Sequence, residues 1–137
     1  KSKADAKKVT IVTSGLERIS PVLADQGRLE QVIVNLLDNA IKYSPEGGQI
    51  RINAEEDREF ITVSVIDSGP GVPEASIPRL FERFYRVDSG RSRTEGGTGL
   101  GLAIVKHIVQ LHGGNIWVKN NVGVAGAAFS FTLKKAL

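Results

Sequence analysis

The sequence contains no cysteine and no methionine, and none of its apolar runs reaches the ~18 residues that a membrane-spanning helix needs. Without cysteine, the chain can form neither a disulfide framework nor a thiolate metal site. Its start lacks the pattern of a secretory signal peptide. Hydrophobic residues at 41% and charged residues at 24% are an ordinary globular balance, which excludes a wholly disordered chain. The 137 residues suffice for one domain with a core of its own.

The positive charge of the chain is concentrated at its start. The formal net charge is +3, and residues 1–8 carry all of it, because residues 9–137 hold 14 basic and 14 acidic groups. A native chain starts with methionine and this one does not. We therefore expect residues 1–8 to be the remnant of a junction with a missing segment and residues 9–137 to be the domain. A DNA-binding module is an alternative that rests on the basic end alone, and it predicts salt-sensitive DNA binding that is lost when residues 1–8 are deleted.

Hydrophobic periodicity and turn residues predict the order of the secondary structure. The expected strands are 9–13, 20–24, 49–55, 59–66, 115–120 and 127–133, and the expected helices are 26–44, 76–83 and 99–112. This order predicts an α/β (α+β) two-layer sandwich, in which helices cover one face of a mixed, mostly antiparallel sheet. Segment 87–98 lacks apolar periodicity, and its 12 residues are too many for an idle connector. It is either a functional lid or a disordered segment.

Three polar residues share one face of the helix expected at 26–44. Asn35 and Asn39 are four residues apart, and Lys42 follows three residues later. Two carboxamides on an otherwise apolar helix must find hydrogen-bond partners. They are either structural amides that bond to a neighbouring loop or a polar seam that faces phosphates. In the second case an Asn oxygen would suit Mg²⁺, and Lys42 would bring positive charge to a phosphate.

Two glycine-rich segments lie next to predicted elements, one directly after a strand and one directly before a helix. DSGPG (67–71) comes directly after an apolar strand, and a carboxylate there needs donors such as an adenine amino group. The same residue types also form plain turns. GGTGLGL (96–102) leads into the helix expected at 99–112, where backbone N–H groups and the helix N-terminus favour phosphate. This second segment is neither a P-loop nor a dinucleotide fingerprint.

From about residue 9 to residue 133, the sequence strongly resembles the catalytic and ATP-binding domain of bacterial sensor histidine kinases. The motifs that carry the resemblance are QVIVNLLDNAIKYS (31–44, the N box), DSGPG (67–71, the first glycine box), LFERFYR (80–86, the F box), GGTGLGLAIVK (96–106, the second glycine box) and HGGNIWV (112–118). These domains share the Bergerat-type ATP-binding fold with DNA gyrase B, the Hsp90 chaperones and the MutL repair proteins. The resemblance therefore implies this fold, with ATP and Mg²⁺ as the bound groups.

The resemblance also implies roles for individual residues. Asn39 would coordinate Mg²⁺, and Asp67 would accept a hydrogen bond from the adenine amino group. Arg86 would reach the γ-phosphate, and Lys42 and Arg86 would supply the positive charge that assists transfer. The other residues implied to bind ATP are Asn35, Tyr43, Gly69, Gly71, Tyr85, Gly97, Thr98, Gly99, Leu100, Gly101 and Leu102. Residues 87–97 would form a lid over ATP.

One position favours a kinase over an ATPase. ATP-hydrolysing relatives generally carry a water-activating glutamate four residues before the magnesium asparagine, and here that residue is Asn35. A side-chain amide accepts no proton at neutral pH, so it cannot activate water. The family phosphorylates a histidine of a separate helical dimerisation domain. His107 and His112 are the only histidines here, and since neither has the context of such an acceptor, we expect structural roles for both.

The sequence thus predicts a protein histidine kinase domain that transfers the γ-phosphoryl group of Mg-ATP to a histidine of that dimerisation domain, for onward transfer to the receiver domain of a response regulator. We expect a monomeric cytoplasmic domain of an inner-membrane sensor, with no nucleic-acid partner. The alternative is a regulatory module that senses ATP or ADP without transfer. Most of the arginines of 79–93 are expected to be solvated, and contact with ATP or with the missing domain is the alternative for Arg83, Arg91 and Arg93. Trp117 and Phe129 are expected to pack in the core.

Overall fold

The computed structural model of the chain describes residues 10–14, 26–82, 101–121 and 126–135. Its elements in chain order are β1 (Thr10–Ser14), α2 (Gln26–Tyr43), β2 (Gln49–Glu56), β3 (Phe60–Ile66), the 3₁₀ helix η2 (Glu74–Arg79), α4 (Gly101–Leu111), β4 (Ile116–Asn120) and β5 (Ala127–Lys134). The strand expected at 20–24 and segment 87–98 lie outside the described residues. Neither described α-helix is long and apolar enough to cross a membrane.

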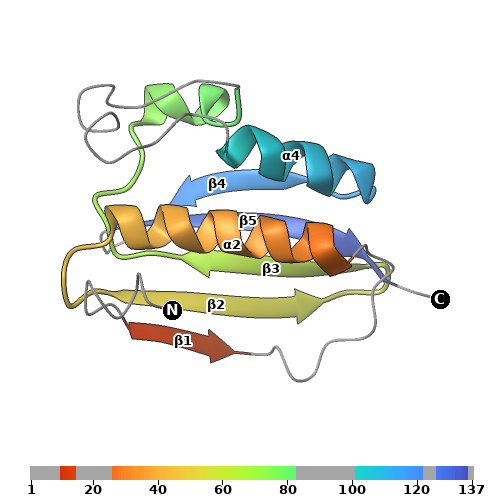
Figure 1. Cartoon of the computed structure of the whole chain (residues 1–137), viewed down its shortest axis with the longest axis horizontal. Helices are drawn as coiled ribbons and strands as arrows, with labels where there is room; N and C mark the ends of the chain where they lie inside the picture. The colour runs from red at the N-terminus through yellow and green to blue at the C-terminus, as the bar shows by residue number, and fades with distance from the viewer. Residues whose placement is uncertain (1–9, 15–25, 83–100, 122–125, 136–137) are drawn as a thin grey trace.

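The five strands form one sheet in the order β1-β2-β3-β5-β4. β1 pairs with β2 in parallel, and every other neighbouring pair is antiparallel. Figure 1 shows α2 and α4 lying over one face of this sheet. The predicted fold, a two-layer sandwich with a mixed, mostly antiparallel sheet, is confirmed.

The core lies between the helices and the alternate residues of the strands that face them. Along β2, β3 and β5 every second side chain is buried, as the period of a half-buried strand requires. Val65 pairs with Ile52 on one side and with Phe129 on the other, so the buried side chains form rows across the sheet. α2 contributes Val32, Leu36 and Ala40, spaced four residues apart on one face.

Two sequence expectations about this core have different outcomes. Phe129 is buried as predicted, at 4% exposure. The placement of Trp117 in the core is wrong, because its neighbours Ile116 and Val118 take the helix-facing positions of β4 and Trp117 projects from the opposite face, 36% exposed.

Glycine and proline end the helices where the sequence predicts. α2 stops before Pro45, and Gly47 has the left-handed φ of +80° that a turn requires. Beyond α4, Gly113 has a φ of +78° and donates its N–H to the Gln110 carbonyl at 3.0 Å, while Gly114 donates to the Val109 carbonyl at 3.0 Å. These two bonds form a Schellman cap.

The short helix expected at 76–83 is η2, which is a 3₁₀ helix and begins at Glu74. Pro78 lies inside it and has no N–H to donate, so a regular α-helical ladder cannot form. Hydrogen bonds between residues three apart close the turns instead: the Ser76 N–H donates to the Pro73 carbonyl at 2.9 Å, and the Leu80 N–H donates to the Ile77 carbonyl at 3.3 Å.

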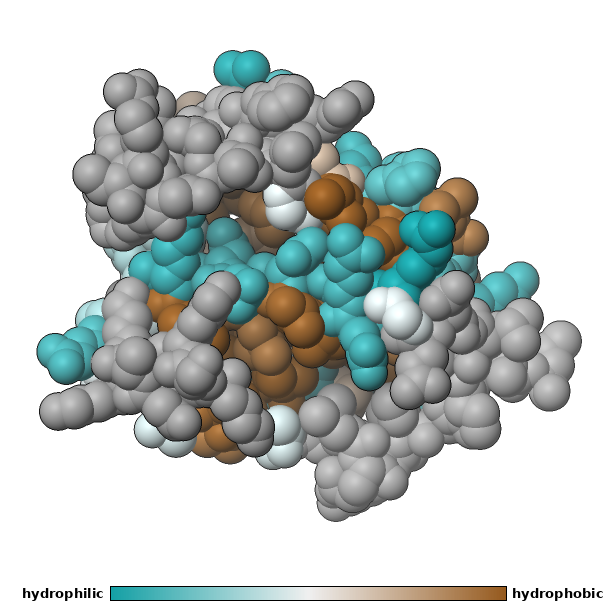
Figure 2. Space-filling model, viewed as in Figure 1, coloured by the Kyte–Doolittle hydropathy of each residue, from teal (hydrophilic) through white to brown (hydrophobic). Residues whose placement is uncertain are grey.

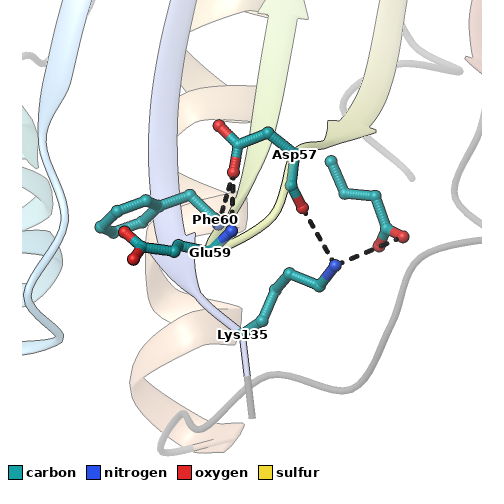
Figure 3. A network of polar contacts seen from close by, with 5 residues as sticks. Asp57, Glu59, Phe60 and Lys135 are labelled. Carbon is teal, nitrogen blue, oxygen red and sulfur yellow. Dashed lines mark hydrogen bonds and ion pairs between the residues drawn. The ribbon is translucent and has the colours of Figure 1, made fainter. Parts of the chain in front are cut away.

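The hairpin between β2 and β3 is fastened by the polar network in Figure 3. Asp57 Oδ1 accepts hydrogen bonds from the N–H groups of Glu59 at 2.9 Å and Phe60 at 2.8 Å, and these bonds hold the pKa of Asp57 below its ordinary value. Lys135 Nζ donates to the Asp57 carbonyl at 3.0 Å and lies 3.5 Å from Glu56 Oε2. The residue after β5 therefore locks the turn of the hairpin.

Candidate functional site

Asp67 lies where the ends of two neighbouring strands meet. It follows the last residue of β3, and the first residue of β5, Ala127, is beside it. The Asp67 N–H donates to the Ala127 carbonyl at 2.9 Å, and the Ala127 N–H donates to Asp67 Oδ1 at 3.1 Å. The Gly69 N–H donates to the same Oδ1 at 3.0 Å. The orientation of the carboxylate is thus fixed by backbone groups.

The Asp67 carboxylate is buried, at 6% exposure. Burial raises its pKa above the ordinary 3.8, and the two backbone N–H bonds oppose that shift without cancelling it. Both of these hydrogen bonds fall on Oδ1, and no group in the described part of the chain donates to Oδ2. Oδ2 therefore keeps its capacity to accept a hydrogen bond, and it is suited to receive a donor from a ligand.

Gly69 and Gly71 shape the loop that follows Asp67. A Cβ on Gly69 would lie 2.4 Å from the Tyr43 carbonyl oxygen, so this loop packs directly against the C-terminal end of α2. Gly71 has a φ of +87°, and a Cβ there would lie 2.8 Å from Asn120 Oδ1. Glycine is therefore required at both positions, at the first by close approach and at the second by backbone conformation as well.

The predicted polar face of α2 exists as a row of half-buried side chains: Asn35, Asn39, Lys42 and Tyr43. Asn35 Nδ2 donates to the Gly101 carbonyl at 3.5 Å, which links the row to the start of α4. Lys42 Nζ lies 5.4 Å from the centre of the Tyr43 ring. The row runs from α4 at one end to Gly69 at the other. Figure 2 shows a hydrophilic band over α2.

Asn39 lies in the middle of this row and makes no hydrogen bond to any described residue. Asn35 matches the structural alternative, since its amide bonds to a neighbouring backbone carbonyl, whereas Asn39 does not. The amide oxygen of Asn39 is a hard, neutral ligand of the kind that suits Mg²⁺. The Asn39 amide is therefore available to a ligand, and its role as a metal ligand stays a prediction.

The start of α4 completes the site on the side opposite Gly69. Gly101 is its first described residue, and the side chain of Leu102 packs against the core. Unpaired N–H groups and the helix dipole make a helix start favourable for anions. The remaining predicted site residues, Tyr85, Arg86, Gly97, Thr98, Gly99 and Leu100, lie outside the described residues, as does the predicted lid at 87–97. The two histidines lie on α4 and just after it: His107 is exposed, and the His112 ring contacts the Ile108 carbonyl at 2.9 Å.

The F box begins with two anchors on the core. Leu80 is 7% exposed, and the ring of Phe81 meets that of Phe129 edge to face, with centroids 6.2 Å apart. The chain is therefore held on β5 at residue 81, just before the rest of the F box.

The structure also identifies polar residues that the sequence reasoning missed. Ser68 clamps Gln49, because its Oγ accepts from the Gln49 N–H at 3.0 Å and donates to the Gln49 carbonyl at 2.9 Å. Asn121 Nδ2 donates to the Asp67 carbonyl at 3.1 Å. Ser44 Oγ is buried at the end of α2, without a hydrogen-bond partner among the described residues. The sequence feature that could have indicated these residues is the pair of adjacent amides, Asn120 and Asn121, at the end of an expected strand.

Residues 24–137 match the family described as histidine kinase-, DNA gyrase B-, and HSP90-like ATPase. Among curated proteins, the sensor histidine kinase WalK of Bacillus subtilis (strain 168) is 49% identical over 111 residues, which are 80% of this chain and 18% of WalK. This chain therefore spans less than a fifth of the length of that relative.

Solved structures agree with this match. The catalytic domain of histidine kinase ThkA superposes with a TM-score of 0.83 at 33% identity, covering 98% of this chain and 85% of that domain. ThkA in complex with the response regulator protein TrrA gives a TM-score of 0.80 at 31% identity, over 98% of this chain and 36% of that one. Full-length ShkA in complex with AMPPNP gives 0.82 at 32% identity, over 99% of this chain and 28% of ShkA. With the fold of a histidine kinase catalytic domain and the family pattern along most of its length, this chain belongs to the histidine kinase-, DNA gyrase B- and HSP90-like ATPases.

Proposed function

We propose that this domain binds Mg-ATP and presents its γ-phosphoryl group to a histidine of a separate dimerisation domain in a two-component sensor kinase. The observation that carries the proposal is the Asp67 carboxylate, which is buried and fixed through Oδ1 while Oδ2 lacks a donor among the described residues. The similarity to ShkA, which was solved with the ATP analogue AMPPNP, supports a nucleotide as the ligand.

Asp67 would recognise the base. The adenine amino group is a hydrogen-bond donor that matches Oδ2, whereas guanine carries a carbonyl oxygen at the corresponding position and would oppose the carboxylate. Gly69 packs directly on the Tyr43 carbonyl and so holds the loop after Asp67 against the end of α2. Tyr43 at the end of α2 and Gly71 would flank the base and ribose.

The polar row on α2 would hold the phosphates and the metal ion. Asn39 would be the protein ligand of Mg²⁺, and when bound this ion neutralises the charge that develops on the phosphoryl oxygens. Lys42 would add positive charge from the same helix, and the N–H groups at the start of α4 would face the phosphates. Arg86 and Tyr85 would contribute from the F box, and Gly97 to Leu100 from the second glycine box.

Asn35 would disfavour hydrolysis. Its amide donates a hydrogen bond to the Gly101 carbonyl, and an amide has no basic site for a proton of water at neutral pH. The phosphoryl group would therefore be kept for an external nucleophile. We place that nucleophile on a separate helical dimerisation domain. From there the phosphoryl group would pass to a response regulator, a partner class also found with ThkA. The parent protein would be a membrane sensor with this domain in the cytoplasm.

The test is transfer in trans. The chain is mixed with radiolabelled Mg-ATP and with the separately produced dimerisation domain of its full-length protein. Acid-labile label should appear on the dimerisation domain, slowly and in proportion to its concentration, because the covalent link that raises the effective concentration is absent. The chain incubated alone should bind nucleotide without becoming labelled. Label that accumulates on the isolated chain, or an acceptor that stays unlabelled at saturating ATP, would contradict the proposal.

A further inference from the structure

Two amide side chains at the end of β4 fasten both ends of the loop formed by residues 67–72. Asn121 Nδ2 donates to the Asp67 carbonyl at 3.1 Å. Asn120 Oδ1 accepts from the Val72 N–H at 2.7 Å, and Asn120 Nδ2 donates to the Val72 carbonyl at 2.8 Å. The loop that contains Asp67 is thus connected to β4 at its first and last residues.

The two bonds between Asn120 and Val72 reproduce a step of strand pairing. A side-chain amide carries the same donor and acceptor as a peptide group, so Val72 bonds to Asn120 as it would to the backbone of a neighbouring strand. Asn120 itself pairs with Ala127, and Ala127 exchanges two hydrogen bonds with Asp67. Asp67, Ala127 and Asn120 therefore form one row across the end of the sheet.

The fit between Asn120 and the loop is tight. Gly71 has a φ of +87°, and a Cβ on it would lie only 2.8 Å from Asn120 Oδ1. Asn120 Nδ2 also lies 3.4 Å from Glu74 Oε2, so the amide contacts the start of η2 as well. Pro70, at the middle of the loop, is exposed, and Val72 is only half buried. The Val72 side chain packs against the core, while both polar groups of the Val72 backbone bond to the Asn120 amide, which therefore sets the path of the backbone there.

We propose that Asn120 is a positioning residue for base selection: it holds loop 67–72 where Asp67 Oδ2 can receive the amino group of adenine. This inference rests on the proposed adenine-nucleotide function. A hydrogen bond requires a donor–acceptor distance of roughly 2.7–3.2 Å, so a loop that moves by about 1 Å loses the discrimination between an amino group and a carbonyl. Asn120 acts on specificity through the loop and does not contact the base.

The test compares ADP and GDP as calorimetric ligands of the whole chain. Asn120→Ala removes all three bonds and should weaken ADP about tenfold, leaving the weaker GDP binding nearly unchanged, so that the preference for ADP falls. Asn120→Asp keeps the acceptor for the Val72 N–H but sets a carboxylate oxygen against the Val72 carbonyl and Glu74 Oε2, so its loss should be at least as large as that of alanine. Asn115→Ala is the matched control, because Asn115 lies exposed just before β4 and its side chain makes no hydrogen bond to any described residue. It should bind both nucleotides as the wild type does.

Amide exchange and thermal melts separate positioning from stability. In Asn120→Ala the Val72 amide should exchange faster, at a temperature where the variant is still fully folded. An unchanged ADP-to-GDP ratio in that folded variant would overturn the inference, even if its melting temperature fell. A wild-type chain without preference for ADP would instead overturn the proposed function on which the inference rests.

Discussion

At the scale of single residues, Asp67 is held in a way that costs the apo protein stability. Burial raises its pKa, which means that the fold disfavours the charged form, while only one of its oxygens has donors among the described residues. Sites that bind ligands commonly carry such a cost, since the ligand supplies the missing partner. A substitution of Asp67 that weakens nucleotide binding without lowering the stability of the apo fold would therefore support its role in binding the ligand.

Asp67→Asn should weaken ADP and ATP by about 1–3 kcal/mol, the range for hydrogen bonds to a charged group. The amide nitrogen that would replace Oδ2 is itself a donor and cannot accept the amino hydrogen. Calorimetry measures the change, and Asp57→Asn in the distant hairpin is the control that should leave binding unaffected. Equal ATP and GTP affinities in the wild type would refute the assignment of Asp67 to adenine.

The same substitution should not destabilise the apo fold at neutral pH. Because the folded-state pKa of Asp67 is raised above 3.8, the folded state keeps its proton longer than the unfolded state, and the free energy of unfolding falls as the pH rises through that window. An asparagine carries no such penalty and can still accept the two backbone N–H bonds through its oxygen. Urea unfolding at several pH values from about 4 to about 7 should place Asp67→Asn level with or above the wild type at neutral pH. A clear loss of stability at neutral pH would contradict this.

At the scale of elements, two glycines of the site should respond oppositely to alanine. A Cβ on Gly69 would lie 2.4 Å from the Tyr43 carbonyl, so Gly69→Ala must displace the loop from α2 and should cost about 1–3 kcal/mol. A Cβ on Gly101, in α4, would have no atom of the described residues within 4 Å, so Gly101→Ala should stabilise the fold by up to about 1 kcal/mol. Chemical denaturation measures both. Equal effects would mean that the loop does not pack on α2 as described.

The β2–β3 hairpin makes a separate prediction, away from the site. Asp57→Ala removes the acceptor of the Glu59 and Phe60 N–H groups and should lower the melting temperature, whereas Asp57→Asn keeps an acceptor oxygen and should recover most of it. Because the pKa of Asp57 is lowered, the contribution of its charge is present above pH 3.8 and is lost as the pH falls through the lower, folded-state value. Melting curves of the three proteins at about pH 7 and about pH 3 measure this. Identical curves at neutral pH would contradict it.

The sequence predicted the elements better than the contacts between them. The alternation of apolar residues predicted β2 and β3, and the glycines that follow α4 predicted its end, because these signals are local. The direction of Trp117 depends on the register of β4, which local pattern does not fix. The role of Asn120 was not predictable either, since its partner Val72 is 48 residues away and is brought near only by the order of the strands. Asp67 and Asn39 were predicted from motif and spacing, but their differing hydrogen bonding required the fold.

At the scale of the whole molecule, the architecture brings the ends of three strands and one helix to the same end of the sheet. β3 ends there just before Asp67, β5 begins there, β4 ends at Asn120, and α2 ends at Tyr43, whose carbonyl lies beside Gly69. Figure 1 shows these ends together, opposite the hairpin that Lys135 fastens. The proposed nucleotide site and the stabilising hairpin network thus occupy opposite ends of the sandwich, and changes at sites so far apart should be additive.

This separation allows one variant to remove function while leaving the fold intact. Asn39 is half buried on α2 and makes no hydrogen bond to any described residue, and alanine is the best helix former, so Asn39→Ala should unfold at the wild-type temperature or slightly above it. The same variant should lose the Mg²⁺ dependence of nucleotide binding and abolish transfer to the dimerisation domain, because the proposed metal ligand is gone. Val34→Ala, on the exposed face of the same helix, is the control and should retain both activities. If Asn39→Ala binds ATP with unchanged Mg²⁺ dependence, the assignment of the Mg²⁺ ligand to this helix is wrong. A variant that fails to fold would show instead that Asn39 has a structural role.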